Sequence, residues 1–119
     1  MRKLHAEIEV MTNYFGITKI NWSRQHDFVK KVLIHKITRC SESHKIRLSV
    51  GTAMKYNEVA ALIDKGFFVY VMVNEGSEHY TLGDLVGIIP GEQDNYLESV
   101  DEAGNPTDSL YDLPLWVEK

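Results

Sequence analysis

The chain has 119 residues, of which 44% are hydrophobic and 25% charged, and its formal net charge is −4. This composition predicts one globular domain whose core needs neither metal nor disulfide, and it excludes a wholly disordered chain. No apolar run reaches the roughly 20 residues of a membrane-spanning helix, and Glu7 and Glu9 stand where a signal peptide needs an apolar core. Cys40 is the only cysteine, so we expect a cytoplasmic protein.

Antiparallel strands are expected in the first part of the chain. Residues 4–10 alternate between apolar and polar side chains, which is the period of a half-buried strand. Residues 14–21 and 28–37 are rich in β-branched and aromatic side chains and flank a polar stretch, so they predict a hairpin. Residues 45–50 alternate again and predict the next strand.

One helix is expected in the middle of the chain. Asn57 is a suitable N-cap, and Glu58 follows at the positive end of the helix dipole. Gly66 is suited to end the helix in a left-handed conformation. The apolar residues that recur at helical spacing on one face are Val59, Leu62 and Ile63.

The part after the helix predicts a buried strand and a second hairpin. Residues 67–73 are apolar on both faces, so they should form a central strand that is covered on both sides. Residues 74–84 predict the longest loop, because polar residues and glycine dominate there. Residues 85–89 and 95–100 then form the hairpin.

The last residues predict a tail that closes the core. Asn105 is a candidate N-cap, Pro106 suits a first helical position and Pro114 stops the helical path, which together predict a single helical turn. We expect the apolar side chains of this tail to be buried: Leu110, Leu113 and Trp116. A detachable docking peptide is the alternative interpretation.

Together these elements predict an α+β fold. The expected architecture is a mostly antiparallel sheet of five or six strands, with one short helix packed on it and a C-terminal tail that contains the helical turn. Residues 1–10 are interpreted as an N-terminal extension that adds an extra strand. Residues 11–119 form a single globular domain that includes the closing tail.

Short motifs along residues 14–114 follow the pattern of one family. An aromatic pair precedes Ile17 and Thr18, and the helix starts with Glu58 and Val59. A strand motif is matched by Val29, Lys31, Val32, Ile34 and His35. The closing motif, which is the most specific, is matched by Tyr96, Leu97, Ser99, Asp101, Asp108, Leu110, Leu113 and Pro114.

In these motifs the chain resembles a bacterial family catalogued as domain of unknown function 3892. The resemblance implies that the tail belongs to the domain, and it carries no activity over to this chain. The chain departs from the family pattern at Glu98, where the family has arginine, and at Ser109, where it has asparagine. If those family residues form a polar contact or hold a ligand, that role is altered here.

Residues that could carry catalysis or hold a metal are sparse in this sequence. His26, His35, His44 and Cys40 lack the paired spacing of a zinc site, and Cys40 stands among turn residues without an evident base partner. No glycine-rich stretch has the spacing of a phosphate-binding loop. We therefore expect no catalytic residue, no metal and no cofactor.

Charge is distributed unevenly along the chain. Residues 1–47 contain 10 Lys and Arg against 4 Asp and Glu, whereas residues 48–119 contain 3 against 13. The basic part could bind an anionic partner, or the opposed charges could drive self-association. Alternatively, the two halves pair with each other within one sheet.

Two groups of residues are candidates for binding a partner. Trp22, Arg24 and His26 combine an aromatic ring with cationic groups at an expected hairpin tip, as in interface hot spots and base-stacking sites, although Trp22 could instead fold back onto the sheet. The second group consists of cations on the expected strands, which could contact phosphates or could simply be solvated: Lys30, Lys31 and Arg47.

The predicted function is that of a non-catalytic binding or interaction module. Such an accessory or inhibitory protein would act through its surface on a protein partner or by self-association. Nucleic-acid binding by the basic N-terminal half is the alternative. An enzyme would require a pocket lined by several titratable residues.

Overall fold

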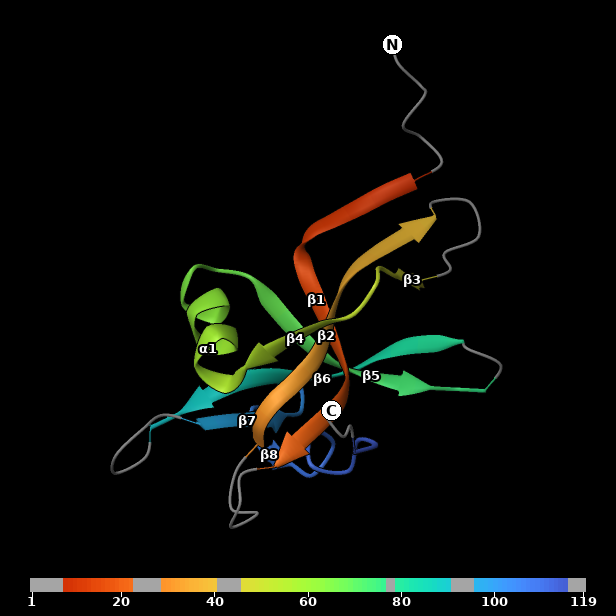
Figure 1. Ribbon diagram of the computed structural model, residues 1–119. Helices are drawn as coiled ribbons and strands as arrows, with labels where there is room; N and C mark the ends of the chain where they lie inside the picture. Colours follow the sequence, from red (N-terminus) through yellow and green to blue (C-terminus); the bar gives the residue numbers. More distant parts are fainter. Residues whose placement is uncertain (1–7, 23–28, 41–45, 77–78, 91–95, 116–119) are drawn as a thin grey trace.

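The computed structural model describes residues 8–22, 29–40, 46–76, 79–90 and 96–115. The chain forms one curved sheet and one helix, so the fold is α+β (Figure 1). The elements in chain order are β1 (Ile8–Trp22), β2 (Val29–Cys40), β3 (Ile46–Leu48), β4 (Thr52–Lys55), α1 (Tyr56–Asp64), β5 (Phe68–Asn74), β6 (Tyr80–Ile89), β7 (Tyr96–Val100) and β8 (Pro106–Thr107). Among the described residues, no helix is long and apolar enough to cross a membrane.

The sheet is mixed and has eight strands, so the expectation of a mostly antiparallel sheet of five or six strands is wrong. The strand order is β3-β2-β1-β5-β6-β7-β8, and β4 pairs with β2 beyond the end of β3. β1 and β5 run parallel, because α1 and its flanking segments carry the chain across one face of the sheet before β5 begins. β4 and β8 were not predicted, because they are short and lack a clear alternating pattern.

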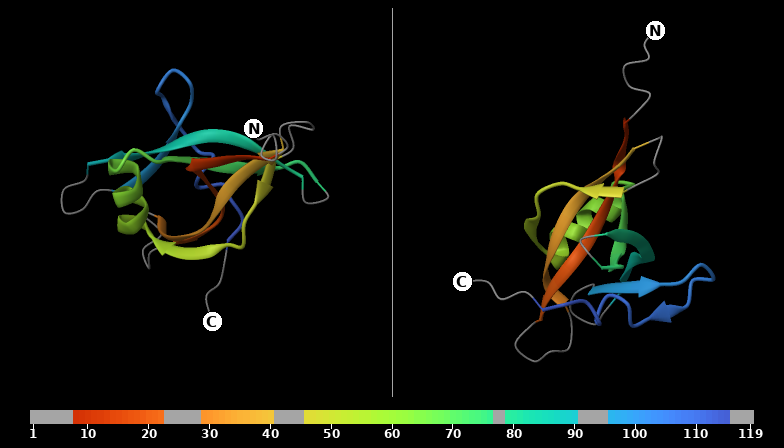
Figure 2. Two further views of the ribbon diagram at one scale, coloured as in Figure 1. Left: turned by 90° about the horizontal axis from the view of Figure 1, so that it is seen from above. Right: turned by 90° about the vertical axis from the view of Figure 1, so that its right-hand side faces the viewer.

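A single long strand, β1, occupies the region where two strands were expected. It pairs with β2 from Ile8 to Trp22, and the pairing is interrupted by three irregularities in register. Such bulges bend a strand and increase its twist. The sheet therefore curves around its core, as the view from above shows (Figure 2).

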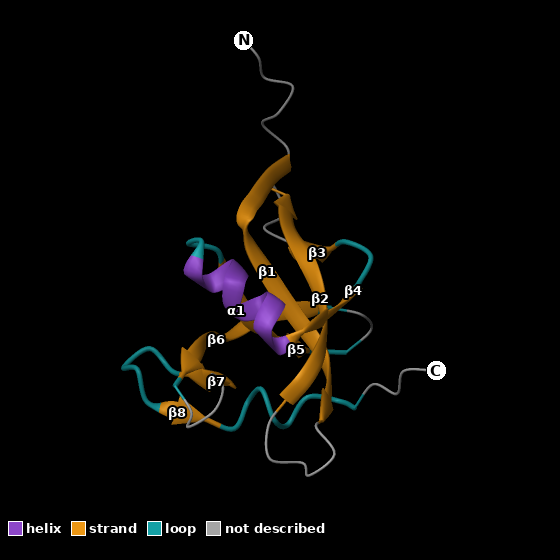
Figure 3. Cartoon of the chain, turned by 60° about the vertical axis from the view of Figure 1, so that its left-hand side comes forward, coloured by secondary structure: helices purple, strands orange, loops and turns teal. Residues whose placement is uncertain are grey.

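The core lies between the inner face of this curved sheet and α1 (Figure 3). Val59 of α1 is fully buried, and Leu62 and Ile63 pack against the same cluster. The buried residues that the sheet and the tail contribute are Ile17, Ile20, Val29, Val32, Ile34, Val69, Val71, Val86, Leu97 and Leu110. At about 25 cal/mol per Å² of buried apolar surface, this cluster is the main source of stability.

The helix begins two residues earlier than predicted. Lys55 is the N-cap, and its backbone N–H donates to Oε1 of Glu58 at 2.9 Å, so Asn57 lies inside the helix and the N-cap prediction is wrong. A glutamate at the third helical position can satisfy the capping amide in this way, which leaves Asn57 without that role. Gly66 has a φ of 97°, and the predicted left-handed end of the helix is confirmed.

The outer face of the sheet is only partly covered. Ile37 and Met72 are buried there. A Cβ added to Gly16 would clash with the Met72 sulfur, so a glycine at this position lets that side chain lie across β1. β5 is central, as predicted, but its two ends are open: Phe68 is 43% exposed and Val73 42%. The prediction that both faces of this strand are covered is therefore wrong outside its middle.

The tail begins with a hairpin instead of a helix start. The backbone N–H of Asp101 donates to the carbonyl of Asn105 at 3.0 Å, and Gly104 between them has a φ of 88°. This tight turn directs Pro106 into β8, opposite Val100, so the predicted helix start at Asn105 and Pro106 is wrong. One α-turn follows, in which the N–H of Asp112 donates to the carbonyl of Asp108 at 2.9 Å.

The end of the tail joins β1. Leu110 is fully buried, and Leu113 packs against the core cluster. The backbone N–H of Ile20 donates to the carbonyl of Pro114 at 3.1 Å, and Leu115 forms a parallel bridge with Ile20. The tail thus spans from β8 to the far end of β1 (Figure 3), and the structure describes it as far as Leu115.

Candidate binding groove on the outer sheet face

A bulge in β6 shapes the surface of the sheet beside β5. Tyr70 pairs with Leu85 and Met72 with Leu82, so Gly83 and the residue after it lie together opposite one residue of β5. A Cβ added to Gly83 would lie 2.7 Å from the Val71 carbonyl oxygen, which only glycine tolerates. The bulge places Leu82 and Leu85 on the same outer face, although simple alternation would separate them.

The bulge also positions the carboxylate of Asp84. Its Oδ2 accepts hydrogen bonds from the hydroxyl of Ser109 at 2.5 Å and from the hydroxyl of Thr107 at 2.8 Å. These two hydrogen bonds, the Ser109 bond foremost, hold the pKa of Asp84 below its ordinary value. Asp84 is therefore a fixed negative charge, and its stabilising effect is present at neutral pH and is lost as the pH falls through its lowered pKa.

Ser99 connects this carboxylate site to the tail. Its side chain is fully buried, its hydroxyl donates to the carbonyl of Thr107 at 3.0 Å, and its oxygen accepts from the backbone N–H of Leu110 at 3.1 Å. Its hydroxyl also lies 2.8 Å from that of Thr107. Hydrogen bonds thus tie β6, β7, β8 and the tail into one unit.

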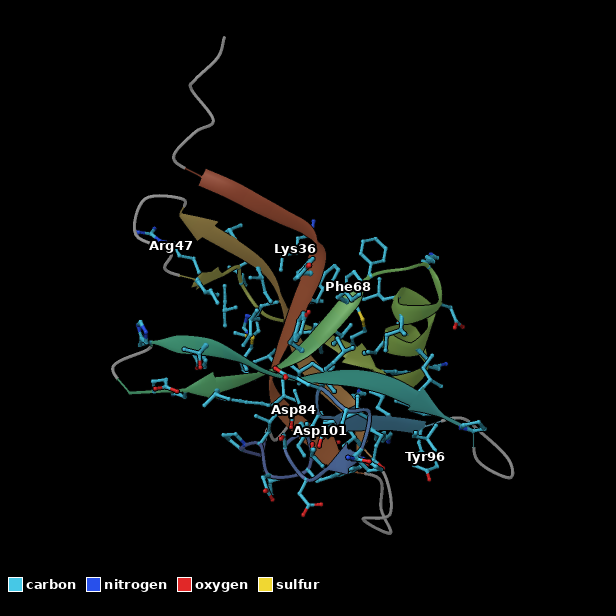
Figure 4. The ribbon with its side chains drawn as sticks, turned by 180° about the vertical axis from the view of Figure 1, so that it is seen from behind. Lys36, Arg47, Phe68, Asp84, Tyr96 and Asp101 are labelled. Carbon is cyan, nitrogen blue, oxygen red and sulfur yellow. The ribbon has the colours of Figure 1, made fainter. Side chains whose placement is uncertain are left out.

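An open hollow of about 540 Å³ lies beside this unit, and we call it the outer groove. Its lining combines one aromatic ring, aliphatic side chains and three carboxyl groups: Tyr70, Leu82, Gly83, Asp84, Leu85, Val100, Asp101 and Glu102. Figure 4 shows Asp84 and Asp101 close together, at the side of the molecule away from Arg47. Oδ1 of Asp101 accepts from the backbone N–H groups of Ala103 and Asn105, both at 2.9 Å, so this carboxylate is also fixed in place.

Part of β6 at the groove is a strand edge. β7 pairs with β6 only from Leu85 to Ile89, and among the described strands Tyr80–Asp84 of β6 pairs with β5 alone. After Val100 the chain turns away into the hairpin at Asp101. The position in line with β7, next to Leu82 and Asp84, is therefore where an added extended segment would lie.

The binding residues proposed from sequence do not form one site. Trp22 ends β1 opposite Val29, while Arg24 and His26 lie outside the described residues. Lys30 and Lys31 lie at the start of β2, whereas Arg47 of β3 pairs with Thr38, seven residues and about 23 Å further along β2.

The residues of the predicted tail motif lie at several places. Tyr96 is half-buried at the start of β7, Asp101 fixes the hairpin turn, and Asp108 and Pro114 are exposed. Leu110 and Leu113 lie in and against the core, and Trp116 lies outside the described residues.

Sequence reasoning missed the outer groove because Leu82, Gly83 and Asp84 were assigned to a loop. The signal was Gly83 itself, which follows Leu82 and shortly precedes Leu85 and Val86; an isolated glycine in such an apolar stretch indicates, in a strand, a bulge or a close backbone approach. The side chains of Tyr70 and Glu102 gave no comparable signal, since only the pairing of β5, β6 and β7 brings them together.

His35, which was considered as a metal ligand, has a structural role. Its Nδ1 lies 2.7 Å from the carbonyl of Ser49, which can only accept, so Nδ1 carries a proton. Its Nε2 lies 2.8 Å from the hydroxyl of Thr18, which is buried. Within the described part of the chain, no three His, Cys, Asp or Glu residues are grouped so that they could hold a metal.

Glu98, on β7, works against the stability of the fold at neutral pH. Burial, and secondly the charge of Asp108, raise the pKa of Glu98. A raised pKa means that folding favours the protonated carboxyl. The stability that Glu98 contributes is therefore present at low pH and is lost as the pH rises through the pKa of the folded state. We expect Glu98→Gln to be more stable than the parent near pH 7, with a gain that shrinks toward about pH 4.

Urea unfolding of both proteins at a series of pH values measures this gain. Glu102→Gln, which removes an exposed acid of the adjacent hairpin, is the control and should show a smaller gain. A Glu98→Gln variant whose advantage stayed constant from acidic to neutral pH would contradict the assignment.

The chain matches no family model, no curated protein and no solved structure. What the outer groove can bind therefore follows from its lining residues. Its titratable groups are three carboxyls and the phenol of Tyr70, whose pKa is raised by burial and by Tyr14. Fixed carboxylates beside aromatic and aliphatic side chains bind cationic groups that carry apolar stems.

Proposed function

We propose that this protein is a non-catalytic binding module that holds an extended, basic segment of a partner protein in the outer groove. One observation carries the proposal: fixed carboxylates, an aromatic ring and an open strand edge meet in the same hollow. Asp84 and Asp101 are each oriented by two hydrogen bonds, so little ordering is needed when a partner binds.

Each part of the groove suits one part of such a segment. The unpaired edge of β6 beside the groove, at Leu82 to Asp84, can pair with the backbone of an added strand. The apolar surface of Tyr70, Leu85 and Val100 suits the aliphatic stem of lysine or arginine, whose charged end then reaches the carboxylates. Opposite charge across the interface also raises the rate of association and selects against acidic partners.

A peptide titration followed by NMR tests this function. The probe is a short peptide of alternating arginine and leucine, which has the alternation of a strand, and the reference is the same peptide with glutamate in place of arginine. We expect the basic peptide to shift the amide signals of Leu82, Gly83 and Val100, and the acidic peptide to leave them unchanged. Glu102→Lys should weaken binding about five- to tenfold, because it places a cation at the exposed rim.

Asp112→Lys is the matched control, because Asp112 is an exposed acid that does not line the groove. The proposal is wrong if the basic peptide shifts no groove signal, or if Asp112→Lys weakens binding as much as Glu102→Lys. It is also wrong if the protein self-associates without peptide and Glu102→Lys abolishes that association, since the occupant would then be a second copy of the chain.

A further inference from the structure

Three lysines gather on one surface of β1, β2 and β4. Lys55 of β4 lies directly opposite Lys31 of β2 in the antiparallel pairing, and Lys31 in turn lies opposite Asn21 of β1. In the adjoining row Lys19 of β1 lies opposite Leu33 of β2. We call the surface formed by Lys19, Lys31 and Lys55 the lysine face.

The three side chains share the outer side of the sheet. Ile20, Val32 and Met54 form the row between them, and these residues belong to the core cluster or pack against it. Since neighbouring residues of a strand point to opposite sides, the lysines point away from the core. Lys19 and Lys55 are exposed and Lys31 is half-buried.

This arrangement concentrates positive charge on a small part of the sheet. Lys31 and Lys55 lie directly opposite each other on paired strands. Lys19 lies on the diagonal from Lys31, roughly 7 to 8 Å away, and the span from β1 to β4 is two strand spacings, about 10 Å. An anion that extends across these strands would lie within reach of all three ammonium groups.

We infer that the lysine face contacts the phosphate backbone of a nucleic acid. Lysine acts as a point charge on a flexible stem, which suits phosphate contacts that do not depend on base sequence. A backbone with regularly repeated phosphates can extend across all three strands and offer each lysine a separate contact. On the same side of the sheet as the lysines, Ala53 is exposed and Leu33, opposite it, is half-buried, so this face offers little of the bulky apolar surface that inserts into a lipid.

The inferred surface differs from the one that the sequence indicated. Lys31 belongs to both, but Lys19 and Lys55 take the place of Lys30 and Arg47. Arg47 of β3 lies opposite the other end of β2. Lys55 comes from the acidic half of the chain, so the division of charge along the sequence does not delimit the surface.

Fluorescence anisotropy with a labelled oligothymidylate of about 20 nucleotides tests the inference. With three phosphate contacts on a single strand, the logarithm of the binding constant should fall with the logarithm of salt with a slope of about −2 between about 50 and 200 mM. The triple variant Lys19→Gln, Lys31→Gln, Lys55→Gln should lose at least about tenfold in affinity and most of this slope. Its circular dichroism spectrum and melting curve show whether it is folded.

The matched control replaces Lys36, Arg47 and Lys65 by glutamine, which removes the same charge from exposed positions outside the lysine face. It should retain most of the affinity. If the triple variant does not fold, Lys55→Glu alone replaces it, because Lys55 is exposed on a strand that, among the described strands, pairs only with β2.

Three results would overturn the inference: equal losses in the control and in the triple variant, a salt slope near zero, and binding to phosphatidylserine vesicles without binding to the oligonucleotide. Glu102→Lys should leave oligonucleotide binding in place, because the outer groove is formed by β5, β6, β7 and the hairpin after β7. The inference and the proposed function therefore fail separately.

Discussion

Replacing Leu110 by alanine is expected to lower the free energy of unfolding by about 3 kcal/mol. Leu110 is fully buried among core residues of the sheet, and its backbone N–H is held by the buried Ser99 hydroxyl. That hydrogen bond and the Pro114 contact to β1 keep the tail in place, so the site cannot collapse to fill the cavity. Urea unfolding followed by circular dichroism measures the loss.

The tail supplies its own control in Leu115→Ala. Leu115 is 63% exposed, so its truncation should change the free energy of unfolding by less than about 0.5 kcal/mol. Deletion of residues 105–119 removes Leu110 and the tail contacts together and should give an insoluble protein or one that melts far below the parent. A Leu110→Ala variant that unfolds like the parent would instead identify the tail as a detachable docking peptide.

Replacing Gly83 by alanine is expected to lower the free energy of unfolding by about 2 kcal/mol or more. The new methyl group would lie 2.7 Å from the Val71 carbonyl oxygen and 3.0 Å from a methyl carbon of Val73. Because a backbone oxygen cannot swing aside like the end of a side chain, β5 and β6 must separate at the bulge. The same shift should move Asp84 away from the hydroxyls of Thr107 and Ser109 and disturb the outer groove.

Gly87→Ala is the matched control on the same strand. No atom lies within 4 Å of a Cβ built there, so alanine should be neutral, or slightly stabilising because it loses less backbone entropy on folding. Thermal unfolding of both variants compares their stabilities, and NMR shifts of Leu82 and Asp84 report on the groove. Equal effects at Gly83 and Gly87 would show that the close approach at the bulge does not limit stability.

Local patterns were sufficient for the elements that depend on neighbouring residues. The alternation of apolar side chains located most strands, helical spacing located α1, and Gly66 ended it as expected, because these signals act over a few residues along the chain. The predicted N-cap, Asn57, was wrong because two capping arrangements were compatible with this sequence. In the structure Lys55 is the N-cap, and the Glu58 side chain accepts from its backbone N–H.

The sequence by itself determined an α+β domain with one helix, a central β5 and an apolar tail. Only the tertiary structure decided that β5 runs parallel to β1, that the Gly83 bulge opens the outer groove, and that Lys19, Lys31 and Lys55 share one face. The physical reason is that strand order and register depend on contacts between residues far apart in the chain. A shift of one residue in register moves every side chain to the opposite face, and no local pattern specifies that shift.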